Sequence, residues 1–234
     1  MKVGFWGYPN PEIIKDLQVQ NPEWIDLDVD FGYPNSNILP DAYCKIIKNI
    51  VDNAIFLKPD VIVAAIGKDK CDSGWFAAYI LKELGFNVIT SKFEDISNRR
   101  PVPISESDLP LRKKIELITA QIIKPVKLPI FHKSNPSFGF WGVPPNDLSI
   151  LELFPDETHV FGWTRCVEAN VPADIELEME VVKDLPTVFY SQAFCAKSQL
   201  AKFLAKKYDG LYIDIDDYAT NSIKAKIEAF LKLR

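Results

Sequence analysis

The chain has 234 residues, of which 47% are hydrophobic and 25% are charged, and its formal net charge at pH 7 is −5. This composition is typical of a globular protein, and without a long basic cluster it argues against binding to nucleic acid or to an anionic membrane surface. No stretch approaches the ~18–20 apolar residues of a membrane span, and the first residues lack signal-peptide organisation, so we expect a cytoplasmic protein.

The first half of the chain alternates strand patterns with helix patterns. Residues 60–66 are nearly all apolar and rich in β-branched side chains, as expected for a parallel strand that is covered on both faces. Residues 41–57 carry apolar side chains at three- and four-residue steps, which is typical of an amphipathic helix. The whole series predicts strands at residues 2–6, 24–29, 60–66 and 87–90 and helices at residues 11–17, 41–57 and 75–84.

The second half repeats this alternation after a connecting stretch. A polar region at residues 95–103 leads into an amphipathic helix at residues 107–123, which Pro125 and Pro129 interrupt. Beyond it we expect strands at residues 138–141, 159–161, 187–191 and 211–215 and helices at residues 146–153, 173–182, 200–208 and 220–233. Strands that alternate with helices imply right-handed crossovers and parallel sheets.

A short motif indicates that the two halves are copies of one unit. Residues 4–7 read Gly-Phe-Trp-Gly, residues 139–142 read the same, and a proline follows two residues after each copy. In both halves an apolar strand runs into a cysteine and then into a helix. We therefore predict an α/β fold of two Rossmann-like, doubly wound parallel-sheet lobes related by internal duplication. Lobe 1 comprises residues 1–105, a helical connector residues 106–135, and lobe 2 residues 136–234.

The four cysteines carry the chemistry that the sequence offers. Cys44 lies at the opening of a predicted helix, and Cys71, Cys166 and Cys195 lie where strands end. Loops at the carboxyl ends of parallel strands converge on one crevice, where ligands bind, and helix N-termini favour the thiolate. Four thiolates suit zinc or a [4Fe–4S] cluster, whereas the absence of a Cys-x-x-Cys pair argues against a zinc ribbon or a ferredoxin loop. The alternative is that the cysteines are small buried core residues.

These strand ends also resemble a known family. Its carriers are Gln-Ala-Phe-Cys at residues 192–195, Leu-Tyr-Ile-Asp-Ile-Asp at 211–216, Lys-Ile-Glu-Ala-Phe-Leu at 226–231, Pro-Asp-Val-Ile-Val at 59–63 with Cys-Asp-Ser at 71–73, Leu-Pro before Cys44, and Pro-Glu-Ile-Ile at 11–14. Together they are similar to the 2-hydroxyacyl-CoA dehydratase family, which includes 2-hydroxyglutaryl-CoA dehydratase D components, benzoyl-CoA reductase subunits and double-cubane cluster proteins. The chain is a shortened version, and Gly7 stands where many members carry a further cysteine.

The resemblance implies a function and a set of ligands. It implies a [4Fe–4S] cluster in the cleft between two lobes, with Cys71 and Cys195 as the first candidate ligands and Cys44 and Cys166 as the next. It implies low-potential electron transfer or reductive catalysis of the 2-hydroxyacyl-CoA dehydratase type, fed by an ATP-dependent activator protein, in a homodimer or heterodimer. The missing length corresponds to the segments that cradle acyl-CoA in longer members, so the substrate stays open.

Two other functions are compatible with the same residues. A clusterless scaffold or small-molecule binding module would keep the fold without using the cysteines. A thiol-redox or zinc protein would use Cys71 and Cys195 without iron. The chain has no Gly-x-Gly-x-x-Gly motif and no P-loop lysine, so a Rossmann nucleotide site or an ATPase activity has no support.

Overall fold

The structure is a computed structural model that describes residues 1–124 and 128–234, and it divides into two compact units, Met1–Asp95 (unit 1) and Ile96–Arg234 (unit 2). The described residues form two four-stranded, all-parallel sheets with strand orders β2-β1-β3-β4 and β6-β5-β7-β8. The predicted α/β fold with two parallel-sheet lobes is thereby confirmed. The helix break predicted at Pro125 lies outside the described residues.

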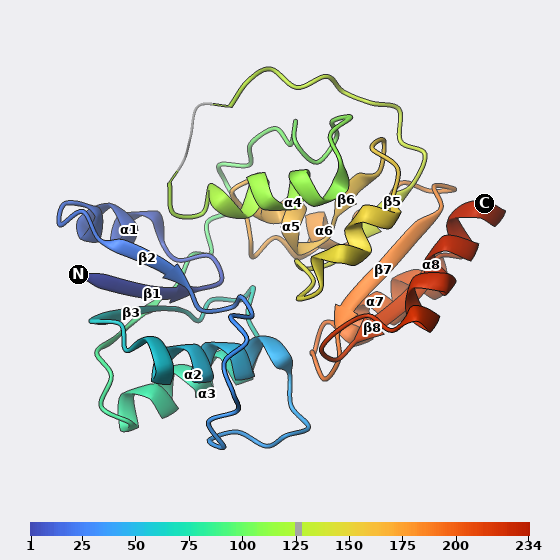
Figure 1. Ribbon diagram of the computed structural model, residues 1–234. Coiled ribbons are helices and arrows are strands. Elements are labelled where there is room, and N and C mark those ends of the chain that lie inside the picture. Colours follow the sequence, from blue (N-terminus) through green and yellow to red (C-terminus); the bar gives the residue numbers. More distant parts are fainter. Residues whose placement is uncertain (125–127) are drawn as a thin grey trace. The chain divides into compact units, whose positions relative to one another are not determined.

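In unit 1 the helices cover both faces of the sheet. Helix α1 lies on one face, and α2 and α3 lie side by side on the other (Figure 1). Strand β3 is buried along almost its whole length, as its apolar sequence predicts. The elements are β1 (Lys2–Trp6), α1 (Pro11–Gln18), β2 (Glu23–Asp26), α2 (Lys45–Leu57), β3 (Val61–Ala65), α3 (Asp72–Glu83) and β4 (Val88–Ser91).

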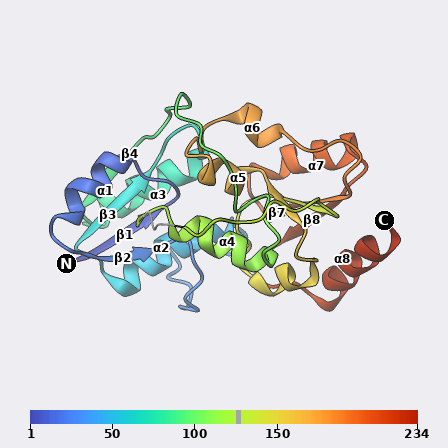
Figure 2. The same ribbon diagram turned by 90° about the horizontal axis from the view of Figure 1, so that it is seen from above.

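In unit 2 a helix from the predicted connecting stretch, α4, packs against the sheet. Its elements are α4 (Leu111–Ala120), β5 (Gly139–Trp141), the 3-10 helix η1 (Leu148–Leu153), β6 (His159–Phe161), α5 (Trp163–Glu168), α6 (Ile175–Met179), β7 (Thr187–Gln192), α7 (Ser198–Lys207), β8 (Leu211–Ile215) and α8 (Asn221–Leu233). Helices α4, η1 and α8 bury one face of the sheet through Leu111, Ile150 and Ile227, whereas α7 covers the other face (Figure 2).

The repeated motif begins in the strand next to the edge strand of each sheet, β1 beside β2 and β5 beside β6. Strand β1 pairs with β2 and β3, and β5 pairs in the same way with β6 and β7. The motif tryptophans Trp6 and Trp141 are each 1% exposed, and their indole N–H groups donate to the carbonyls of Ala65 and Glu178, at 3.1 and 2.7 Å. A buried indole needs such a partner, so both tryptophans are core anchors of their own unit.

Several local predictions differ from the structure. The predicted α-helix at residues 146–153 is the 3-10 helix η1, and the predicted helix at residues 173–182 is reduced to the five residues of α6. Helix α5 has no counterpart in the prediction, because it follows β6 after a single residue, Gly162, whose φ is 74°. In the described residues no helix combines the length and the apolar character needed to cross a membrane.

Candidate functional site

Each unit carries two of the four cysteines, and all four lie in the described residues without a disulfide bond. Cys44 and Cys71 belong to unit 1, where Cys44 is buried and Cys71 is exposed. Cys166 and Cys195 belong to unit 2, where Cys166 is buried and Cys195 is half-buried. We describe each unit by itself.

Cys44 and Cys71 occupy the same position at the start of neighbouring helices. Cys44 is the N-cap of α2 and Cys71 is the N-cap of α3. The hydroxyl of Tyr43 donates to Oγ of Ser73 at 3.0 Å, which ties the residue before Cys44 to the helix that Cys71 opens. The two thiols therefore lie at the starts of adjacent helices, and a hydrogen bond joins the residue before α2 to the first turn of α3.

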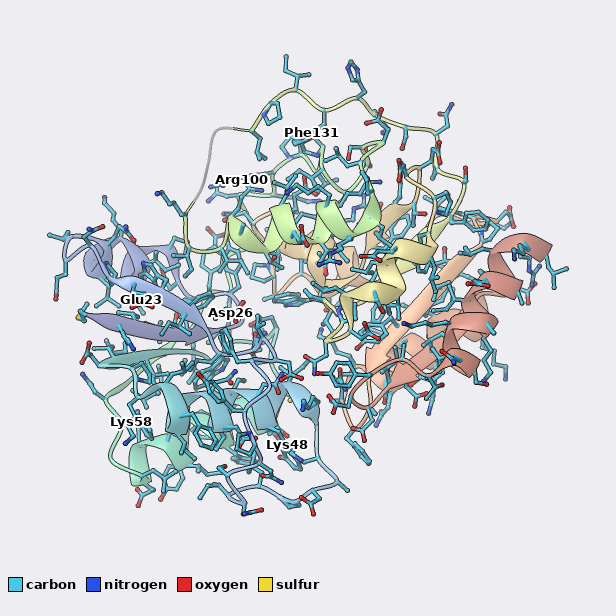
Figure 3. All side chains as sticks on the ribbon, in the orientation of Figure 1. Glu23, Asp26, Lys48, Lys58, Arg100 and Phe131 are labelled. Carbon is cyan, nitrogen blue, oxygen red and sulfur yellow. The ribbon has the colours of Figure 1, made fainter. Side chains whose placement is uncertain are left out.

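These helix starts lie at the carboxyl edge of the sheet in unit 1. Figure 3 shows Lys48, in the first turn of α2, at the same end of the unit as Asp26, the last residue of β2, whereas Glu23 and Lys58 mark the opposite end. Parallel α/β sheets bind ligands outside the carboxyl ends of their strands. The helix starts also carry the positive end of the helix dipole, which stabilises a negatively charged sulfur. The predicted placement of Cys44 and Cys71 at strand-to-helix junctions agrees with this geometry.

A charged cluster surrounds Lys70, the residue before Cys71. Its ammonium lies 3.6 Å from Oδ2 of Asp69, and its side chain is only 20% exposed. Burial by itself lowers the pKa of Lys70, but the negative charges of Asp69 and Asp28 outweigh burial, so the pKa is raised. The ammonium is thus held in its charged form next to Cys71, where it adds to the positive potential at the start of α3.

Two half-buried carboxyl groups complete this cluster. Burial, followed by the charge of Asp28, raises the pKa of Asp26 to about 7. Burial also raises the pKa of Asp28, against the lowering effect of Lys70. Oδ2 of Asp28 accepts a hydrogen bond from the Gly7 amide at 2.9 Å, and Oδ1 of Asp26 accepts one from the Asp28 amide at 3.0 Å. At neutral pH the Asp26 carboxyl is therefore partly protonated.

The second glycine of the repeated motif is needed to accommodate Lys70. Gly7 has a φ of 67°, and a Cβ atom there would lie 2.2 Å from Cε of Lys70. Any larger residue at position 7 requires the Lys70 side chain to move. The cluster was not predicted from the sequence, although aspartates at positions 26, 28 and 30 alternate there with apolar residues.

In unit 2, Cys195 lies in a tightly held turn after β7. Its amide donates to the Gln192 carbonyl at 3.1 Å, and its carbonyl accepts from the Ser198 amide at 3.0 Å. The side-chain amide of Gln192 donates to the Ile215 carbonyl at 2.6 Å and its oxygen accepts from the Tyr190 hydroxyl at 3.0 Å. Cys195 thus sits just before α7, the helix that corresponds to α3 of unit 1, on a backbone fixed by buried hydrogen bonds.

Cys166 has a different environment from the other three cysteines. It lies inside helix α5 rather than in a loop, and it is 0% exposed. Its thiol donates to the Asp174 carbonyl at 3.8 Å. Burial, followed by the charge of Glu178, raises the pKa of Cys166 well above its usual value. Cys166 is therefore a neutral core thiol in this structure.

The burial of Cys166 leads to a prediction. Cys166→Ala is expected to destabilise unit 2 by about 1 kcal/mol, because it removes one buried sulfur from a small apolar cluster with Ala169, Val171 and Leu177. Urea unfolding followed by circular dichroism measures this loss. Cys166→Asp, which adds a charge at the same place, is expected to cost at least about 3 kcal/mol. Equal stability of the two variants would contradict burial of this site.

Across residues 1–124 and 128–234, no group of three or more His, Cys, Asp or Glu side chains is arranged to hold a metal ion. Each unit supplies two of the four cysteines. The assignment of all four as ligands of one cluster stays a prediction.

Comparison with known proteins adds no assignment. No protein-family model matches the chain, and neither the curated proteins nor the solved structures yield a match.

Proposed function

We propose that the chain is a cysteine-ligated iron–sulfur protein of the 2-hydroxyacyl-CoA dehydratase type, which takes part in low-potential electron transfer or reductive catalysis. The observation that carries this proposal is the pair of thiols, Cys44 and Cys71, on adjacent helix starts, with the Lys70 ammonium beside Cys71. Positive potential favours thiolates, which are the ligands that iron–sulfur clusters use.

The environments of the cysteines refine the expected ligand set. Cys71 and Cys195 remain the first candidates, because both precede a helix and neither is fully buried. Cys44 is the next, through its position at the start of α2. Cys166 fits a structural role better, because its thiol is in the core and its pKa is raised. We therefore propose Cys44, Cys71 and Cys195 as the ligands of a [4Fe–4S] cluster, with one iron left to a ligand other than cysteine.

Such a cluster would supply one-electron transfer, and the charges around Lys70 would affect its reduction potential. The reduction potential of a cluster depends on net charge and on hydrogen bonds near its sulfurs. The Lys70 ammonium would stabilise the more negative, reduced state, whereas ionised Asp28 would oppose it. An ATP-dependent activator protein as electron donor, and an acyl-CoA as acceptor, belong to the proposal through the family resemblance.

Anaerobic purification with cluster reconstitution tests the proposal. The wild-type chain is expected to bind about four iron and four sulfide per chain and to show an EPR signal after reduction. Cys71→Ser and Cys195→Ser are expected to lose most of the iron, whereas the matched control Cys166→Ala is expected to retain it. A colourless, iron-free chain after reconstitution would overturn the proposal.

The exposure of Cys71 also favours a second candidate function, in which the same cysteines serve thiol-redox chemistry or bind zinc. Zinc analysis of the purified chain distinguishes the zinc alternative from the iron–sulfur proposal. Mass spectrometry after mild oxidation distinguishes the thiol-redox alternative, since a reactive Cys71 would gain mass in the iron-free chain while buried Cys166 would not.

A further inference from the structure

A tyrosine hydroxyl bridges the two ends of the turn that carries Cys195. The Tyr212 hydroxyl lies 3.0 Å from Oγ of Ser191 in β7, whose side chain is buried. The same hydroxyl is hydrogen-bonded to the side chain of Ser198, the first residue of α7. The residues between the two serines, 192–197, form the turn that contains Cys195. One phenol therefore closes this turn from both sides.

Tyr212 is itself held by the sheet of unit 2. It lies in β8, where its backbone pairs with that of Phe189 in β7, and its ring packs against the buried cluster that α7 covers. The ammonium of Lys202 lies 5.1 Å from the ring centroid, within the range of a cation–π interaction. Burial is the largest cause that raises the pKa of Tyr212, and the charge of a Cys195 thiolate also raises it. The sulfur of Cys195 therefore lies within electrostatic range of a phenol that is fixed in place.

Unit 1 holds a cysteine-bearing helix start in the same way. The Tyr43 hydroxyl donates to Oγ of Ser73 at 3.0 Å, and Ser73 lies two residues after Cys71. In both units a tyrosine hydroxyl therefore contacts a serine in the first turn of the helix that follows a first candidate ligand. Tyr43 precedes α2 whereas Tyr212 lies in β8, so the two tyrosines come from elements that do not correspond. Duplication of one unit does not account for both contacts.

We propose that Tyr43 and Tyr212 are positioning residues, whose hydroxyl groups fix the two helix starts so that Cys71 and Cys195 are oriented for cluster binding. This inference rests on the proposed iron–sulfur function and names the groups that orient its first two ligands. Hydrogen bonds around a metal site orient its ligands, and ligands that are fixed before the metal binds lose less conformational entropy on binding. The tyrosines act through the cysteines and need not touch the cluster.

Alkylation of the reduced, iron-free chain with iodoacetamide at constant pH, read for each cysteine by peptide mass spectrometry, tests the contact in unit 2. Tyr212→Phe removes only the hydroxyl and is expected to speed the alkylation of half-buried Cys195 about 10-fold, because two hydrogen bonds no longer hold the turn. Cys166, in the core of the same unit, is expected to react as slowly as in the wild type, whereas a general loss of stability would speed both cysteines. The matched control Tyr208→Phe removes a hydroxyl at the other end of α7 and is expected to change neither rate.

Tyr43→Phe is the corresponding test in unit 1. It is expected to speed the alkylation of buried Cys44 about 5-fold, because the hydrogen bond to Ser73 is lost and the start of α2 is held less firmly. Ser73→Ala removes the other partner of this bond, so the double variant is expected to react no faster than either single variant. The matched control Tyr79→Phe, on the exposed side of α3, is expected to leave the rate unchanged.

Reconstituted chains test the link between the tyrosines and the cluster. Tyr43→Phe and Tyr212→Phe are expected to take up iron like the wild type but to lose it to a chelator about 10-fold faster, whereas Tyr208→Phe is expected to lose it at the wild-type rate. Wild-type rates of alkylation or of iron loss in both variants would overturn the positioning role and leave the iron–sulfur proposal intact. A wild-type chain that takes up no iron would overturn both, because the cysteines would then have no cluster to hold.

Discussion

Lys70→Met is expected to destabilise unit 1 by about 3 kcal/mol at pH 8, because it removes the cation that faces the carboxyl groups of Asp28 and Asp69. The loss is expected to be smaller at pH 5. There the Asp26 carboxyl, whose pKa is raised to about 7, is mostly protonated, so one negative charge fewer faces the ammonium. Hydrogen exchange of the β1 and β3 amides measures the stability of unit 1 alone. An equal loss at both pH values would show that the Asp26 carboxyl stays ionised.

The matched variant Asp26→Asn is expected to act in the opposite direction. The folded-state pKa of Asp26 is about 7, above the ~3.9 of an unfolded aspartate. The folded state therefore binds more protons than the unfolded state, and the contribution of Asp26 to stability falls as pH rises from about 4 to 7. The asparagine side chain is uncharged, and its oxygen can still accept the hydrogen bond from the Asp28 amide. The substitution should remove this pH dependence and stabilise unit 1 by about 1–2 kcal/mol at pH 8.

Gly139→Ala is expected to destabilise unit 2 by about 3 kcal/mol, whereas the duplicate substitution Gly4→Ala should cost unit 1 about 1 kcal/mol. A Cβ at Gly139 would lie 2.5 Å from Oγ1 of Thr187, which is fully buried and donates to the Leu185 carbonyl at 2.9 Å. A Cβ at Gly4 would lie 2.9 Å from Cδ1 of Leu27, the end of a side chain that can rotate.

Urea unfolding of the two glycine variants, read from hydrogen exchange of the β5 and β1 amides, compares the two copies of the motif directly. The backbone entropy gained by replacing glycine is the same for both, so it cancels in the comparison. Equal losses would mean that Thr187 moves aside as easily as Leu27. In that case close packing against Thr187 of β7 would not be the reason for a glycine at position 139.

The pattern of apolar residues was enough to predict the two sheets. Strand β3 is a continuous apolar run, its counterpart β7 has the apolar centre Val-Phe-Tyr, and the repeated motif identified β1 and β5 as equivalent strands. Boundaries were less predictable. Helix α5 was missed because Gly162 turns the chain from β6 directly into it, and η1 tightened into a 3-10 helix in a stretch that reads as α-helical.

The candidate site was predictable only in part. Cys44 and Cys71 were expected at helix starts and lie there, because the strand-to-helix order of a parallel sheet determines those positions. A buried core thiol was the stated alternative for every cysteine, but the helix α5 that buries Cys166 was not predicted, since residues 163–168 have no pattern that separates a loop from a short buried helix. The raised pKa of Asp26 likewise depends first on burial, then on the charge of Asp28 two residues away, and it is opposed by Lys70, which comes from a distant segment.

Local order along the chain therefore determined the strands, the helices, their parallel arrangement and the helix-start positions of two thiols. Long-range packing decided which polar groups are buried and in which charge state. Lys114 illustrates the reason: it is 0% exposed, burial lowers its pKa to about 8, and its ammonium donates to the carbonyls of Asp156 and Thr158. Those carbonyls lie more than 40 residues away in sequence. The solvation of a charge depends on all atoms within a few ångströms, and most of those atoms come from distant parts of the chain.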